Sequence, residues 1–104
     1  MQVSDMDNVD QAITSCNNLI NEMPDAEVEV VFHQSAINAV VKGSRVEERI
    51  RELMRREVTV VACRNSMRSR NITEDQLIEG VKIVNAGVAE IVRKQAEGWY
   101  YLKL

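Results

Sequence analysis

One cysteine of the chain lies where an apolar segment meets a polar, basic turn. The β-branched run Val58–Ala62 lacks polar and apolar alternation apart from Thr59, which is typical of a central parallel strand covered by helices on both faces. Cys63 follows directly, and the carboxyl ends of such strands are where open α/β sheets place their ligands and chemistry. The pattern therefore predicts a thiol at a strand-to-helix turn.

The residues after Cys63 favour its thiolate. A helix that begins near this point would contribute the partial positive charge of its N-terminus, and cationic side chains would act in the same direction. The candidates for supporting the thiolate are Arg64, Asn65, Ser66 and Arg68. The alternative interpretation is that Cys63 is a small buried hydrophobe, as free cysteines often are.

Two other strand ends carry polar or small residues. His33 follows an apolar segment, Val28–Phe32, where a histidine could carry a proton or contact a ligand, or else cap a helix or face solvent. Asn85 and Gly87 follow Val81–Val84, where main-chain amides could approach an anion. Close helix packing is the alternative explanation for the small residues there.

The remaining elements alternate helix and strand. A three- and four-residue apolar period predicts a helix over residues 8–23, with Cys16 on its buried stripe. Residues 35–41 predict a short helix, and capping-box patterns at Ser44–Glu47 and Thr73–Gln76 predict two more helix starts. The alternating aromatic segment Trp99–Leu104 suits a last strand. Short connections between such elements imply right-handed βαβ units around a mostly parallel sheet.

Length and composition exclude several classes of protein. The 104 residues, with 45% hydrophobic and 28% charged side chains, predict one folded domain over residues 1–104. No apolar run reaches membrane-spanning length, and the N-terminus shows neither a basic n-region nor an apolar h-region, so a cytoplasmic protein without a membrane partner is expected. Two distant cysteines and one histidine predict no metal and no organic cofactor.

Charge is distributed unevenly along the chain. The first 41 residues carry seven acidic side chains and no lysine or arginine, which suggests complementary faces within the fold or between subunits. Later basic residues alternate with Glu47, Glu48 and Glu52, as on a solvated helix, so no nucleic-acid partner is expected.

The order of these segments resembles the DsrE/DsrF-like family of small sulfur-relay proteins, which includes the Tus-type sulfur carriers. The resemblance rests on Val28–His33, on the segment from Val58 through Cys63 to Met67, and on Val81–Gly87 leading to Gln95–Tyr100. It implies a three-layer α/β/α sandwich with about five strands, assembled as a homotrimer or homohexamer. It also implies that Cys63 occupies the position at which some members carry sulfur as a persulfide. The chain departs from the family in its short first strand, Met1–Val3, and in having no second cysteine near Cys63.

Two functions follow from these observations. In the first, Cys63 accepts sulfane sulfur from a donor protein and passes it to an acceptor protein, with no cofactor. In the second, the chain is a non-catalytic oligomeric module that binds a small anion or another protein, and Cys63 is a packing residue.

Overall fold

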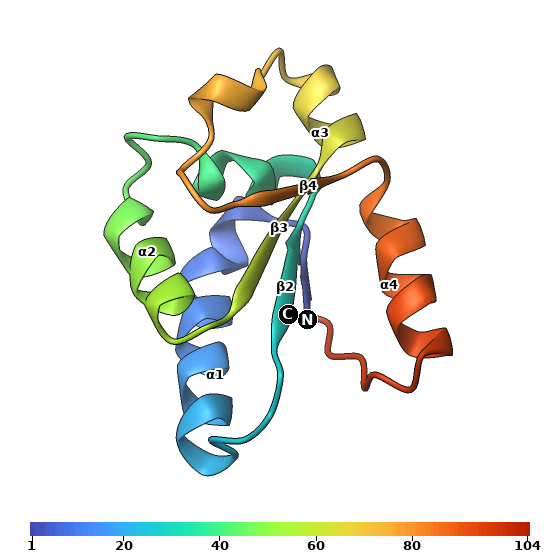
Figure 1. Ribbon diagram of the computed structural model, residues 1–104. Helices are drawn as coiled ribbons and strands as arrows, with labels where there is room; N and C mark the ends of the chain where they lie inside the picture. The colour runs from blue at the N-terminus through green and yellow to red at the C-terminus, as the bar shows by residue number, and fades with distance from the viewer.

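The computed structural model describes residues 1–104 and is built on a parallel sheet (Figure 1). Its four strands lie in the order β1-β2-β3-β4, with bounds β1 Gln2–Val3, β2 Glu29–Phe32, β3 Thr59–Cys63 and β4 Lys82–Val84. Phe32 pairs with Ala62, and Cys63 pairs with Val84. The carboxyl ends of β2, β3 and β4 therefore meet at one edge of the sheet.

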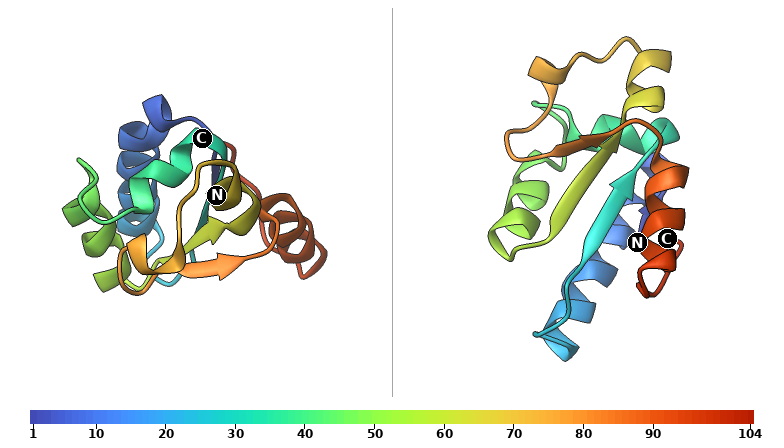
Figure 2. Two further views of the ribbon diagram at one scale, coloured as in Figure 1. Left: turned by 90° about the horizontal axis from the view of Figure 1, so that it is seen from above. Right: turned by 45° about the vertical axis from the view of Figure 1, so that its right-hand side comes forward.

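Helices cover both faces of the sheet (Figures 1 and 2). The helices are α1 Val9–Glu22, α2 Glu47–Arg55, α3 Arg64–Ser69 and α4 Gly87–Ala96, with 3-10 helices η1 Met6–Asn8, η2 Gln34–Val40 and η3 Glu74–Gln76. One face carries α1, α2 and η2, whereas α4 alone covers the other face. This is a three-layer α/β/α arrangement, as predicted.

The apolar core fills the face under α1, α2 and η2. It is a single cluster of 21 buried residues in which Phe32, Ile50 and Leu53 are fully inaccessible. Burying one such side chain stabilises the fold by about 1.5–3 kcal/mol. Cys16 is also fully buried there, which confirms its predicted place on the buried stripe of α1.

Strand residues alternate between the two faces of the sheet. The face under α4 is more polar than the face that carries the core. The paired positions Val31 and Val61 face α4 and are buried, but they lie outside the core cluster. Of the residues in α4, only Gly87 is buried. The second layer is therefore thin.

The predicted fifth strand is wrong in extent. The segment Trp99–Leu104 meets β1 at a single parallel bridge between Gln2 and Lys103, because β1 itself is two residues long and offers no longer ladder. Two hydrogen bonds hold the bridge, from Gln2 N to Leu102 O at 2.9 Å and from Leu104 N to Gln2 O at 2.8 Å.

The helix starts were predicted with mixed success. The capping box at Thr73 and Gln76 is present and opens η3. The one at Ser44 is wrong, because the Ser44 hydroxyl donates to Ala39 O at 2.8 Å and the Glu47 carboxylate accepts from Gly43 N. The segment after His33 forms a 3-10 helix.

No helix in the structure combines the length and apolar character needed to cross a membrane.

Candidate functional site

Cys63 ends β3 and is the N-cap residue of α3. The apolar run Val60–Ala62 anchors the strand in the sheet, so that the thiol emerges where the chain turns into the helix. Only 5% of the residue is exposed. Its Sγ accepts a hydrogen bond from the main-chain N–H of Gly87 at 3.3 Å, which brings the β4–α4 junction against the β3–α3 junction.

Hydrogen-bond donors decide the acidity of this thiol. Burial is the largest single influence and by itself raises the pKa of Cys63. The Ser66 hydroxyl and the main-chain N–H groups of Gly87, Ser66 and Asn65 act in the opposite direction, and together they bring the pKa below its usual value. Donors to sulfur stabilise the charged form, so the thiolate is favoured although the site is buried.

Ser66 is oriented by its own partner. Its Oγ accepts a hydrogen bond from Gln34 N at 2.7 Å, which leaves the hydroxyl proton free to point at the thiol. Gln34 has φ +50°, an uncommon value for a residue with a side chain. The turn after β2 therefore holds one of the donors to Cys63.

Gly87 allows the close approach of α4. A Cβ atom at this position would lie 3.0 Å from Val31 Cγ1, 3.4 Å from Cys63 Cβ and 3.6 Å from His33 Cβ. Close packing and an amide directed at the thiol, considered as alternatives from the sequence, occur together here. Asn85 contributes through its main chain, because its carbonyl accepts from Asn65 N at 3.3 Å.

His33 lies beside Cys63, one residue beyond the last registered pair of β2 and β3. It is 6% exposed, and its Nε2 lies 2.7 Å from Gln2 Nε2. Burial, with a smaller effect of the Lys103 charge, lowers the pKa of His33, so the imidazole is mostly neutral at pH 7.

The arginines do not face the thiol. Arg64 Nη1 pairs with Glu74 Oε1 at 2.9 Å, and Arg68 is exposed on α3. Neither charge is among the influences on the pKa of Cys63. The structure therefore gathers Cys63 with Ser66, Gly87 and His33 and leaves the two arginines at the periphery.

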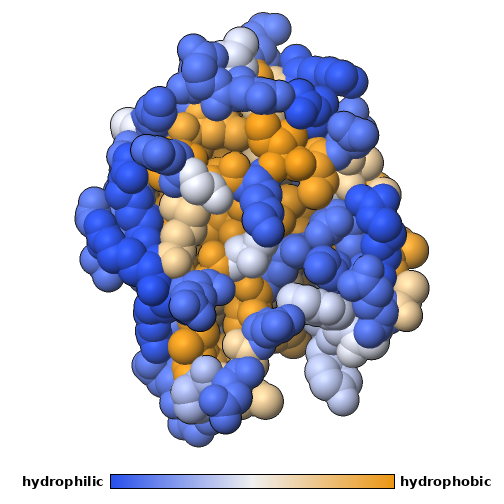
Figure 3. Space-filling view, in the orientation of Figure 1, coloured by the Kyte–Doolittle hydropathy of each residue, from blue (hydrophilic) through white to orange (hydrophobic).

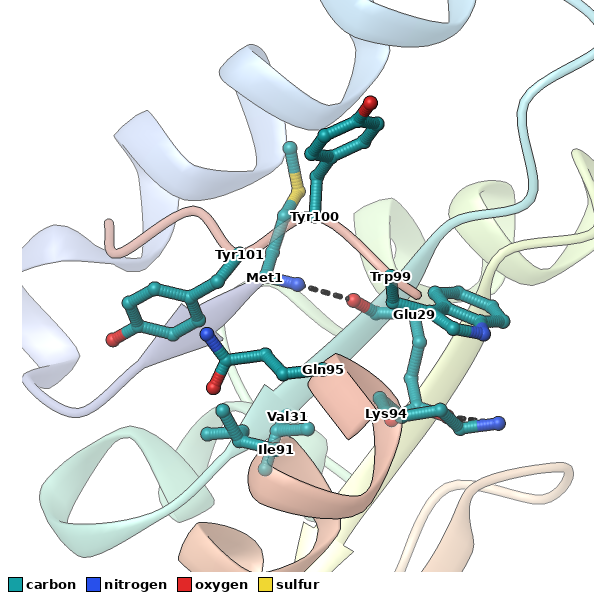
Figure 4. A pocket seen from close by; sticks show the side chains of 9 residues that line it. All are labelled: Met1, Glu29, Val31, Ile91, Lys94, Gln95, Trp99, Tyr100 and Tyr101. Carbon is teal, nitrogen blue, oxygen red and sulfur yellow. Dashed lines mark hydrogen bonds and ion pairs between the residues drawn. The ribbon is translucent and has the colours of Figure 1, made fainter. Parts of the chain in front are cut away.

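A second polar cluster, not predicted from the sequence, lies under α4 (Figure 4). Glu29 on β2 is 8% exposed, and the Glu90 carboxyl on α4 is one of the groups that act on its ionisation. Burial first, then the Glu90 carboxyl, raises the pKa of Glu29 to about 7, although Lys94 Nζ lies 3.9 Å away. The Lys94 ammonium also lies 4.6 Å from the centroid of the Trp99 ring. A glutamate inside an apolar strand was the only sequence signal for this cluster.

Metal-binding geometry is absent from the structure. No three His, Cys, Asp or Glu side chains are arranged to hold a metal ion. The donors around Cys63 are a hydroxyl and main-chain amides, which suit a thiolate or another anion.

Comparisons with known proteins identify relatives of the same fold. The structure of MTH1491 from Methanobacterium thermoautotrophicum, described as a protein of unknown function, is 30% identical, with a TM-score of 0.95 over 99% of this chain and 95% of that chain. The ychN protein from E. coli is 16% identical, with a TM-score of 0.85 over 99% and 96% of the two chains, which shows a shared fold. No curated protein sequence matches. The sequence profile of the DsrE/DsrF-like family matches residues 2–104, and the chain belongs to that family.

Proposed function

We propose that the protein is a sulfur carrier that holds sulfane sulfur as a persulfide on Cys63. The observation that carries the proposal is the hydrogen bond from Gly87 N to Cys63 Sγ at 3.3 Å, which acts with the Ser66 hydroxyl and the Ser66 and Asn65 amides to lower the pKa of a buried thiol. A thiolate is the attacking species in sulfur and disulfide exchange, and a persulfide anion needs the same donors. Family membership is consistent with this role.

The transfer needs no cofactor. The Cys63 thiolate attacks the outer sulfur of a donor persulfide, the new S–S bond forms as the donor S–S bond breaks, and the donor leaves as a thiolate. An acceptor thiolate then attacks the outer sulfur of Cys63-SSH and regenerates the Cys63 thiolate. Donor and acceptor are proteins with reactive cysteines. Because Cys16 is buried in the core on α1, Cys63 works without an intramolecular disulfide.

The carrier is proposed to assemble as a homotrimer or homohexamer. Apolar side chains gather around β4, between α2 and α4 (Figure 3), and β4 is an edge strand without a partner on its outer side. On α4, Val88 and Val92 are 61% and 64% exposed. Uncovered edge strands and apolar patches favour association, and a second subunit would cover both.

The second candidate is a non-catalytic module that binds a small anion or another protein. The observation that favours it is the 5% exposure of Cys63, which is the burial expected of a packing residue. The donors that would hold a thiolate would equally hold a bound anion.

Intact mass separates the two candidates. After incubation with a persulfide donor, wild-type protein should gain the mass of one sulfur atom, and Cys63→Ser should gain none. Cys16→Ser is the matched control and should load as wild type does, because Cys16 is fully buried and burial raises the pKa of its thiol. Sulfur loading of Cys63→Ser equal to that of wild type would refute the carrier and leave the binding module.

A further inference from the structure

A hydrogen-bonded chain links the C-terminal segment to the residue beside the thiol. The bridge between Gln2 and Lys103 holds the segment Trp99–Leu104 along β1. The Tyr101 hydroxyl donates to Gln2 Oε1, and Gln2 Nε2 lies 2.7 Å from His33 Nε2. Figure 4 shows the Tyr101 ring at the end of the pocket under α4, with its hydroxyl directed away from Glu29 and Lys94.

The direction of each hydrogen bond in this chain follows from chemistry. A side-chain amide oxygen only accepts and its NH2 group only donates. Because Oε1 of Gln2 accepts from Tyr101, the NH2 group of Gln2 faces His33 and donates. Nε2 of His33 must then be the acceptor, which places the ring proton on Nδ1.

We propose that Tyr101 and Gln2 are positioning residues that hold His33 as the Nδ1-protonated tautomer beside Cys63. The assignment makes the C-terminal segment part of the site. The tautomer of His33 is a property of the free protein and does not depend on the proposed function. Only the role given to the Cys63 thiol rests on that proposal.

The tautomer determines which charged state the site can adopt. An imidazolium has N–H groups on both nitrogens, so protonating Nε2 would set it against the Gln2 NH2 group. The other charged or titratable groups facing His33 are Lys103 on the C-terminal segment, Tyr101, and Cys63 on β3. Lys103 also disfavours a cation. Cys63 is therefore used as a thiolate held by Ser66 and main-chain amides, without an imidazolium partner.

The tautomer can be measured directly, because His33 is the only histidine in the chain. Long-range 1H–15N correlation spectra of the wild-type protein at pH 7 should show a protonated Nδ1 and an unprotonated Nε2. A protonated Nε2 would overturn the inference without any variant having to fold.

Two variants test whether Gln2 and Tyr101 control the ring. Gln2→Glu replaces the donor with a carboxylate, which accepts from Nε2–H and favours the imidazolium, so the titration midpoint of His33 should rise by about 1–2 pH units. Tyr101→Phe removes the donor to Oε1, so the Gln2 amide can rotate and both tautomers should be populated. Tyr100→Phe is the matched control, since Tyr100 is 98% exposed, and it should give the wild-type spectrum. A His33 midpoint unchanged in Gln2→Glu, or a single tautomer retained in Tyr101→Phe, would contradict the role of the chain.

The pH dependence of Cys63 alkylation connects the tautomer to the thiol. Wild type should show one ionisation, that of the thiol, and Gln2→Glu should show a second ionisation at the raised midpoint of His33. A wild-type profile with two ionisations would overturn the inference. Failure of sulfur loading with an Nδ1-protonated His33 would refute the carrier alone, whereas loading with an Nε2-protonated ring would refute this inference alone.

Discussion

Gly87→Ala measures how closely α4 is held against the thiol. The new methyl group would lie 3.0 Å from Val31 Cγ1 and 3.4 Å from Cys63 Cβ. Val31 is 2% exposed and β-branched, so its methyl groups cannot turn away, and overpacking of this kind costs about 1–3 kcal/mol. Replacing glycine restricts the unfolded chain and offsets about 0.4–1 kcal/mol of that cost. The middle of both ranges gives a net destabilisation of about 1.3 kcal/mol. For a domain near this size each kcal/mol lowers Tm by about 4–8 °C.

The same substitution should weaken the thiolate. Moving α4 outward lengthens the 3.3 Å hydrogen bond from Gly87 N to Cys63 Sγ. A hydrogen bond to a charged group is worth about 1.5–3 kcal/mol, and loss of a third to a half of it raises the pKa of Cys63 by about 0.5–1 unit. The rate of iodoacetamide alkylation as a function of pH gives this midpoint, and urea unfolding gives the stability.

Val31→Ala provides the control, because it removes the methyl groups that the new Cβ would meet. In that background Gly87→Ala should cost less stability and shift the thiol midpoint less, which a double-mutant cycle would record as coupling. A Gly87→Ala variant as stable as wild type, with an unchanged midpoint for Cys63, would refute the close seating of α4.

Three further variants address separate features. Glu29 has a folded pKa of about 7, above its unfolded value, so its contribution to stability is full below about pH 4.5 and is lost as the pH rises through 7. Glu29→Gln should therefore remove this fall in stability with pH from the midpoints of urea unfolding. If the same fall persists in Glu29→Gln, another group causes it. Arg64→Ala should change the alkylation rate of Cys63 by less than about twofold, because its partner is a carboxylate on η3 rather than the thiol; a tenfold loss of rate would show that the arginine charge matters. Replacing both Val88 and Val92 with serine should shift light scattering toward the monomer at micromolar concentration, because both side chains are exposed on α4, and an unaltered mass would place the interface elsewhere.

The sequence predicted the elements that have strong local patterns. The run Val58–Ala62 identified β3 and placed Cys63 at its end, because an uninterrupted β-branched segment has few other structures available in a small α/β domain. The period of α1 placed Cys16 in the core for the same kind of reason. Both features depend only on neighbouring residues in the chain.

The parts that depend on pairing between distant segments were not predictable. Gln2 and His33 are 31 positions apart and meet only through the register of β1 with β2. The arginines were expected to stabilise the thiolate because they follow Cys63 in sequence, but side-chain direction sends Arg64 to Glu74. The donors that lower the pKa of Cys63 come from Ser66, Gly87 and Asn65, which were all candidates from the sequence, but amides carry no residue-type signal that would single them out from the arginines.

The layer formed by α4 is thin, and access to the Cys63 thiol depends on local opening of this helix. Detaching α4 exposes the buried Val31 and Val61 beside Cys63, whereas unfolding the sheet also exposes the 21-residue core. The free energy of opening α4 is therefore below that of global unfolding, and its amides should exchange with deuterium ahead of those in β2 and β3. Opening α4 withdraws the Gly87 N–H from Cys63, which raises the pKa of the thiol, but it also relieves the burial that raises this pKa in the closed protein. Exposure of Cys63 therefore changes its acidity through two opposing effects, and a small reagent that enters without opening α4 meets the thiol with both the burial and the Gly87 donor in place.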